Sequence, residues 1–192
     1  APLNRVTSGN LSTISGSLKA TGSVYVINSA GVVVSRSGRI DTGGTFVASS
    51  RDESDSDFEN GKRKFNGTSH GNVSNAGVIH SANGDVALIG RSATNSGKLS
   101  AANGTASVNA ANHVLLAPQG APVLISGGMG NATNSGTIAA AQAQLNAAGG
   151  NVYALAGNNG GVIRATGTST IGGHVWLTSK SGDTSIRGRV AA

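Results

Sequence analysis

Histidines and carboxylates are the side chains of this sequence that could bind a metal ion or catalyse a reaction. No cysteine accompanies them, and the four histidines lack the i, i+4 spacing that zinc sites prefer. Outside one acidic run only three carboxylates remain, and they are 44 and then 98 residues apart. Because glycosidases and polysaccharide lyases need clustered carboxylates, the sequence predicts no catalytic residue, no metal site and no cofactor. The residues considered are His70, His80, His113 and His174, with Asp41, Asp85 and Asp183.

The strongest concentration of charge is a short acidic run that basic residues follow at once. Its oxygen atoms could hold Ca²⁺, but the run lacks the glycine and the terminal glutamate of an EF-hand loop. Nucleic-acid binding would need aromatic side chains among the basic ones, and none lies there. Although the net charge is +6, we therefore expect an exposed loop excursion and no nucleic-acid partner. The run comprises Asp52, Glu53, Asp55, Asp57 and Glu59, followed by Lys62, Arg63 and Lys64.

The motif Asn-x-Gly-x-aliphatic recurs in the sequence, and the intervals between three of its copies indicate the elements that organise the chain. Its starts are separated by 20 and then 39 residues, close to one and two turns of a solenoid. Asparagine and glycine favour tight turns, so the sequence predicts structural corners on successive coils. These corners are Asn75 with Gly77, Asn95 with Gly97, and Asn134 with Gly136.

A second phrase, glycine followed by a β-branched strand, starts at six glycines separated by 22, 40, 20, 46 and 23 residues. The second and fourth residues after each glycine are apolar, so we expect that face to form the core and the other to look outward. The sequence thus predicts an all-β, right-handed parallel β-helix with coils of roughly 20 residues and one acidic and basic loop excursion. The segment 139–148 stays open between a helical excursion and a coil. The six glycines are Gly22, Gly44, Gly84, Gly104, Gly150 and Gly173.

Three large aromatics stand at the third position after these glycines, on the face expected to look outward: Tyr25, Tyr153 and Trp176. Bare aromatics are costly, so each should be covered by protein or belong to a surface that meets a partner. Tyr153 and Trp176 are 23 residues apart on coils predicted to be consecutive. They are therefore either packed under protein or a flat platform for a sugar ring.

Several sequence motifs, and the order in which they occur, are shared with one family of exported proteins. These motifs are Leu3–Thr7, Gly22–Phe46, Val47–Ser49 before an acidic run, Phe65–Gly67, Asn75–Ile79 and Gly84–Gly90. In this order they resemble the two-partner secretion domain of filamentous haemagglutinin-type exoproteins. The resemblance covers residues 1–118 as an N-terminally incomplete secretion domain, and residues 119–192 more loosely as further coils of the same solenoid.

The resemblance implies export through a dedicated outer-membrane β-barrel transporter, whose periplasmic domains read the unfolded or nascent segment. The family's recognition turn corresponds here to Asn28, Ser29, Ala30, Gly31 and Val32, which keep the asparagine, the glycine and the aliphatic residue but not the family's proline. For Tyr25, the family implies a cover of extra strands flanking the β-helix.

The function expected from this resemblance is a module for secretion and folding nucleation in a large adhesin or haemagglutinin. Such a protein is secreted or held on the cell surface of a Gram-negative bacterium, where it meets a host or bacterial receptor or glycan. The alternatives are the N-terminal part of a contact-dependent inhibition toxin carrier, a haem-acquisition exoprotein and, less favoured, a carbohydrate-active β-helix enzyme.

Overall fold

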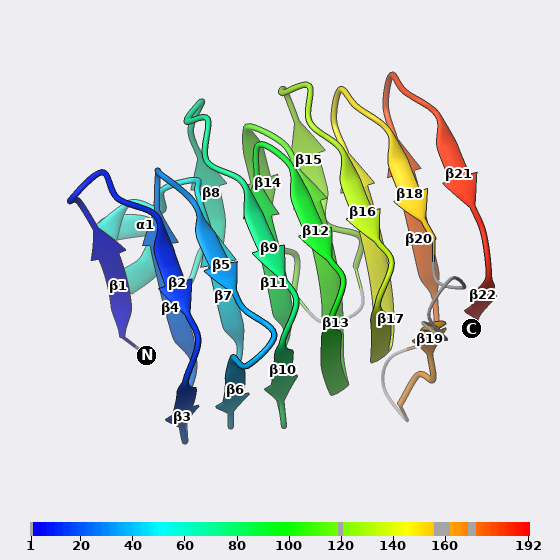
Figure 1. Ribbon diagram of the computed structural model, residues 1–192, viewed down its shortest axis with the longest axis horizontal. Coiled ribbons are helices and arrows are strands. Elements are labelled where there is room, and N and C mark those ends of the chain that lie inside the picture. Colours follow the sequence, from blue (N-terminus) through cyan, green and yellow to red (C-terminus); the bar gives the residue numbers. More distant parts are fainter. Residues whose placement is uncertain (1, 119–120, 156–161, 169–171) are drawn as a thin grey trace.

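The computed structural model describes residues 2–118, 121–155, 162–168 and 172–192, which wind into a parallel β-helix (Figure 1). Two parallel sheets, one of twelve strands and one of seven, run side by side along its axis. This confirms the fold class predicted from the repeats. No helix in the described ranges is long and apolar enough to cross a membrane.

The twelve-stranded sheet consists of two rows, which β13 (Lys98–Ala110) and β17 (Thr137–Ala147) join because each runs through both. The first row contains the last parts of β13 and β17 with β1 (Leu3–Val6), β4 (Val24–Asn28), β7 (Phe46–Ser49), β11 (Val86–Gly90) and β20 (Val175–Ser179). The second row contains their first parts with β3 (Ser17–Ala20), β6 (Arg39–Thr42), β10 (Val78–Ser81), β19 (Val162–Ala165) and β22 (Arg189–Ala191).

The seven-stranded sheet is built from three-residue strands, one from each coil. In order along the axis they are β2 (Ser12–Ile14), β5 (Val32–Val34), β9 (Val73–Asn75), β12 (Ala93–Asn95), β16 (Ala132–Asn134), β18 (Val152–Ala154) and β21 (Thr184–Ile186).

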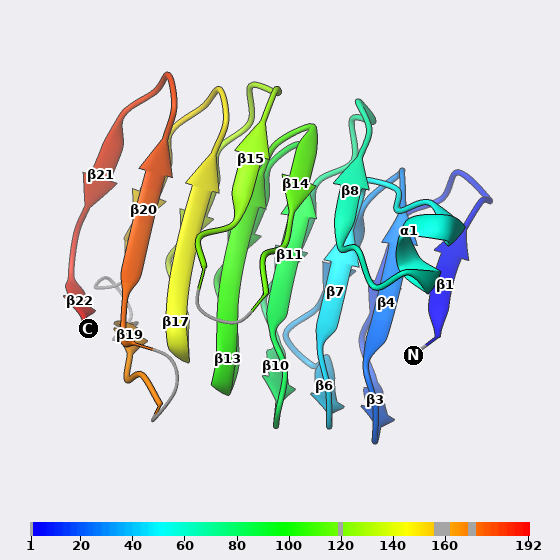
Figure 2. The same cartoon turned by 180° about the vertical axis from the view of Figure 1, so that it is seen from behind.

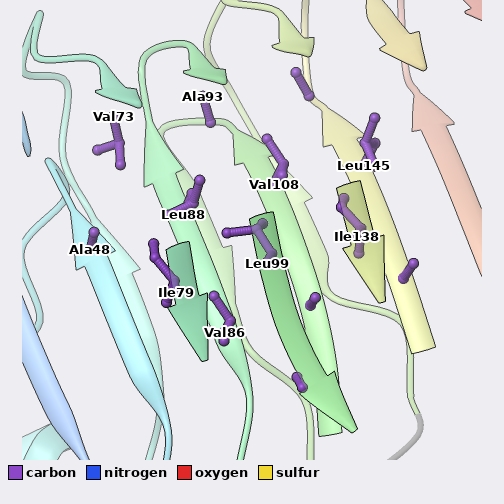
Figure 3. Close-up of a cluster of buried hydrophobic side chains, with 14 of the residues drawn as sticks. Ala48, Val73, Ile79, Val86, Leu88, Ala93, Leu99, Val108, Ile138 and Leu145 are labelled. Carbon is purple, nitrogen blue, oxygen red and sulfur yellow. The ribbon is translucent and has the colours of Figure 1, made fainter. Parts of the chain in front are cut away.

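Small apolar side chains fill the space between the rows and the seven-stranded sheet (Figure 3). They come from the alternate positions that the sequence predicts for the core, and Phe46, Val86, Leu88 and Val108 are fully buried. Burying a side chain of this size contributes about 1.5–3 kcal/mol, so many short strands together stabilise a chain with few aromatics.

The outer face of the first row is also buried from β4 to β17, which corrects the expectation that it faces solvent. Two excursions from the coils fold over it as an antiparallel sheet of β8 (Lys64–Asn66), β14 (His113–Leu115) and β15 (Leu124–Ser126) (Figure 2). The first excursion also carries the helix α1 (Asp55–Glu59). A second apolar cluster lies beneath this cover, so the first row is packed on both faces, as strands of parallel sheets usually are. It includes Tyr25, Ile27, Val47, Phe65, Ala87, Ile89, Val114 and Ile125.

The segment 139–148 is not helical: residues 137–147 form β17, which pairs with β13 on one side and with β19 and β20 on the other. Its alternate residues Ala143 and Leu145 enter the core at strand spacing. The interval of 46 residues ending at Gly150 has a different cause. Gly150 precedes β18 of the seven-stranded sheet, whereas Gly104 precedes the first-row part of β13.

The division expected after residue 118 falls between β14 and β15, which are paired strands of one sheet.

Candidate functional site

The turn that the resemblance singles out joins β4 to β5 and is held by its own asparagine. Asn28 is fully buried, and its Oδ1 accepts a hydrogen bond from the Ala30 N–H at 2.9 Å. The Asn28 carbonyl accepts a second bond, from the Gly31 N–H at 2.8 Å. Gly31 has φ of +115°, and a Cβ there would lie 2.6 Å from the carbonyl oxygen of Asn72. This turn therefore requires its asparagine and its glycine, and no hydrogen bond in it depends on a proline.

The turn is fastened to both neighbouring coils. Asn28 Nδ2 donates to the Asn10 carbonyl and to Ser12 Oγ of the preceding coil, each at 2.7 Å. On the other side, the Val32 N–H donates to the carbonyl of Asn72 at 3.2 Å. Once folded, the turn is thus an integral part of the β-helix.

Ser29 is the one exposed residue of the turn, and it lines a cavity of about 380 Å³ between β1 and the first excursion. Arg5 reaches across this side of the molecule, donating from Nε to Asp52 at 2.8 Å and from Nη2 to Asp55 at 3.0 Å. The folded chain therefore offers a partner Ser29 and the rim of this cavity, while most of the turn is hidden.

The predicted asparagine corners lie in register on β9, β12 and β16. Asn75 Nδ2 donates to Asn95 Oδ1 at 2.8 Å, and Asn95 Nδ2 donates to Asn134 Oδ1 at 2.7 Å. All three side chains are fully buried, so this asparagine ladder satisfies polar groups that would otherwise be costly inside the β-helix.

The glycines of these corners are required by close approach of successive coils. A Cβ on Gly97 would collide with the carbonyl oxygen of Gly77, and one on Gly136 would collide with that of Gly97. The Asn-x-Gly phrase therefore encodes both the ladder and the spacing of the coils.

Arg51 joins the two excursions to the β-helix, and sequence reasoning missed it. Its side chain is almost completely buried and makes four hydrogen bonds. Nε donates to the Ala111 carbonyl at 2.7 Å, Nη1 to the carbonyl and Oγ of Ser69 at 2.6 and 2.8 Å, and Nη2 to Asn112 Oδ1 at 3.3 Å. Burial lowers the pKa of this guanidinium. An arginine beside an acidic run gives no sequence signal of this role.

The acidic run is only partly solvated, because Glu53 is fully buried. Its nearest charged partner is Arg63, whose Nη1 lies 3.6 Å from Glu53 Oε1. Arg63 in turn lies over the rings of Tyr25 and Phe58, with its Cζ 5.0 and 5.1 Å from their centroids. Burial raises the pKa of Glu53 to about 7.

Phe58 and Arg63 of the first excursion thus cover Tyr25, in the same outer layer as the flanking antiparallel strands β8, β14 and β15. The Tyr25 and Phe58 rings meet edge to face at 5.2 Å. Lys62 and Lys64 are exposed, as expected for an excursion, whereas Arg63 is half-buried in this contact.

Comparison of the sequence with models of known protein families identifies the family of this chain. The family model described as the TPS secretion domain matches residues 2–191. The chain belongs to this two-partner secretion family. The match extends beyond the stretch of 118 residues that carries the resemblance in the sequence.

A solved structure supports the fold of this TPS secretion domain. The HMW1 secretion domain from Haemophilus influenzae is similar to it with a TM-score of 0.64 and 24% sequence identity. The similarity covers 94% of this chain and 58% of the HMW1 chain, so the chain spans little more than half the length of that structure. A search of proteins with curated functions found no match.

The two aromatics considered as a glycan platform lie on different sheets of the TPS secretion domain. Tyr153 is on β18 of the seven-stranded sheet, whereas Trp176 is on β20 of the twelve-stranded sheet. Each is half-buried: the Tyr153 hydroxyl accepts a bond from Asn151 Nδ2 at 2.7 Å, and the His174 ring lies 5.0 Å from that of Trp176. The prediction that they stack on one face is therefore wrong, because Gly150 and Gly173 do not occupy equivalent positions.

The histidine and carboxylate side chains that could bind a metal ion or catalyse a reaction do not gather into one site in the described part of the chain. Within the described ranges, no three histidine, aspartate or glutamate side chains could together hold a metal ion. Asp41 on β6 contacts His80 Nδ1 at 2.9 Å, and Asp85 accepts a bond from the Thr105 N–H at 2.7 Å. Asp183 lies before β21 of the other sheet.

Proposed function

We propose that this chain directs the secretion of a large adhesin or haemagglutinin through an outer-membrane β-barrel transporter. The observation that carries the proposal is the TPS secretion domain match over residues 2–191. The protein that contains it would be secreted by, or displayed on, a Gram-negative bacterium.

The second part of the proposed function is nucleation of folding. Each coil pairs in parallel with the coil before it, so folding can propagate from one formed coil to the next. Among the described residues, β20, β21 and β22 each have one paired neighbour. Their other edges can therefore pair with strands of a further coil.

We propose that the transporter's periplasmic domains read the turn of residues 28–32 before it folds. This proposal is supported by the burial of Asn28, Gly31 and Val32 and by the bonds that tie the turn to both adjacent coils. An unfolded segment presents all five residues, whereas in the folded turn only Ser29 is exposed and Ala30 is half-buried.

Binding to purified periplasmic domains tests this order of events. A peptide of residues 24–34 should bind them at least about tenfold more tightly than the folded chain does. A matched peptide carrying Asn28→Ala and Gly31→Ala should lose that affinity. Equal binding by the folded chain, with loss on Ser29→Glu, would show that the folded surface is recognised instead.

The effector region that accompanies this domain separates the adhesin from its alternatives. A contact-dependent inhibition toxin carrier and a haem-acquisition exoprotein would use the same secretion module. Sequencing the complete reading frame distinguishes them, because an adhesin would continue as further solenoid coils while a toxin carrier would end in a distinct toxin domain.

A further inference from the structure

The outward face of the second row differs from that of the first row because none of the strands in the described part of the chain covers it. Two residues of each strand point outward there, and parallel pairing sets them in two lines along the axis. One line contains Ser17, Arg39, Val78, Lys98, Thr137, Val162 and Arg189, and the other Lys19, Asp41, His80, Ser100, Ala139, Arg164 and Ala191.

We call the two lines of outward residues together the basic stripe, because five exposed cations belong to them. These cations are Lys19, Arg39, Lys98, Arg164 and Arg189. Within the described ranges, all but one of them have no side-chain hydrogen bond or ion pair. The exception, Arg39, donates from Nη1 to the carbonyls of Arg36 and Gly38, each at 2.9 Å, and its other guanidinium donors are not used by these bonds.

The basic stripe is separated from most of the negative charge of the chain. Its one acid is Asp41, which contacts His80 at 2.9 Å. Five of the eight acidic residues belong instead to the first excursion, whose helix α1 lies in front of β1 and β4 in Figure 2, while β3, β6 and β10 lie below them. An anion approaching the stripe therefore meets cations with little competition from the protein's own carboxylates.

The spacing of the stripe suits an extended, regularly charged ligand. Six strand intervals separate Lys19 from Arg189, which corresponds to about 29 Å at about 4.8 Å for each interval. The five cations are one to two intervals apart along this length. They thus form a row of single charges and not a compact cluster for one phosphate.

We propose that the basic stripe binds a linear acidic polysaccharide that carries sulfate or carboxylate groups. The stripe contains no aromatic side chain apart from His80, so it lacks the stacking platform of single-stranded nucleic-acid sites. Its apolar members are small, without the aromatic or leucine side chains that anchor protein interfaces or insert into membranes. The inference rests on the proposed adhesin function for its biological setting, and it would identify the class of ligand which that function leaves open.

Heparin is the probe that tests this inference on the purified, folded chain. The expected binding weakens as salt increases, because the contacts are between exposed charges. The variant Arg39→Glu/Lys98→Glu/Arg164→Glu should bind at least about tenfold more weakly, as reversal of three exposed charge contacts implies. The control Lys62→Glu/Lys64→Glu/Arg91→Glu changes the net charge equally but lies off the stripe, and it should change affinity less than about twofold.

Equal losses in the two variants, or no loss in either, would overturn the proposal. A DNA duplex or anionic phospholipid vesicles that bind through the stripe as tightly as heparin would also overturn it. The variant Arg39→Gln/Lys98→Gln/Arg164→Gln, checked for an unchanged circular dichroism spectrum, removes charge without introducing repulsion and should still lose at least about threefold. Transporter-dependent export of the same variants separates the two hypotheses: loss of heparin binding with normal export supports the stripe, whereas absence of heparin binding by the parent chain refutes the stripe alone.

Discussion

Replacing Asn95 by alanine tests whether the asparagine ladder holds the coils in register. The side chain is fully buried, donates to Asn134 Oδ1 at 2.7 Å and accepts from Asn75 Nδ2 at 2.8 Å. Its removal leaves the buried acceptor Asn134 Oδ1 without this donor, and the buried donor Asn75 Nδ2 without its shortest hydrogen bond. Because an unsatisfied buried polar group costs about 1–3 kcal/mol, and Asn75 Nδ2 keeps weaker contacts to two carbonyls at 3.3 Å, we expect a total loss of about 2–3 kcal/mol.

The free energy of unfolding, measured by urea denaturation of both proteins, gives this loss directly. Asn103→Ala is the matched control, because Asn103 belongs to the same coil and donates to the Ala82 carbonyl at 3.0 Å from an exposed position. Water can replace that bond, so the control should lose less than about 0.5–1 kcal/mol. Losses for Asn95→Ala that equal those of the control would refute the structural role of the ladder.

Substitutions at Arg51, Glu53 and Gly97 test the packing of the excursions and the spacing of the coils. Arg51→Met removes four hydrogen bonds that join the excursions and should lower the free energy of unfolding by about 3 kcal/mol; a change below that of an ordinary surface substitution in the same urea experiment would contradict this. Glu53 has a folded-state pKa raised from 4.5 to about 7, so the folded state binds the extra proton and the free energy of unfolding should fall by about 3 kcal/mol as the pH rises from about 4.5 through about 7. Glu53→Gln should flatten that dependence and stabilise the chain at pH 8, and an unchanged profile would disprove the assignment. Gly97→Ala should lower the melting temperature strongly, because its Cβ collides with the Gly77 carbonyl, whereas Gly22→Ala, with no atom within 4 Å of its added Cβ, should leave it nearly unchanged.

The parts of the fold that sequence predicted are those that a short period encodes. The interval from Asn75 to Asn95 equals one coil, and the structure pairs these residues across adjacent strands. Alternation after Gly84 and Gly104 likewise identifies core residues, because successive strand residues must point to opposite faces. The turn at Asn28 was found through a family resemblance, and its local hydrogen bonds explain why its asparagine and glycine are needed.

The parts that sequence did not predict depend on contacts between distant segments. The antiparallel sheet joins residues 64–66 to residues 113–115, and no repeat in the sequence indicates that these segments pair. Without it, neither the burial of Glu53 nor the role of Arg51 could be inferred, since each looks like one charge in a solvated loop. The error at Gly150 has another origin: coils of unequal length place the same glycine-strand phrase on two different sheets.

The basic stripe shows the same limitation for function. Its members Lys19, Arg39 and Lys98 are 20 and then 59 residues apart and appear scattered along the chain. Only the strand register places them on one face. A solenoid can therefore carry a charged surface that its sequence conceals.

Export is the measurement that tests the proposed function most directly. The chain, fused behind a signal peptide and ahead of a passenger, would be produced with and without a two-partner transporter from the same bacterium. We expect that the passenger reaches the medium only with the transporter, and that replacing residues 28–32 by glycine and serine stops export while the same replacement of the exposed residues 60–62 does not. Equal release without the transporter, or retention in the periplasm when the transporter is present, would contradict it.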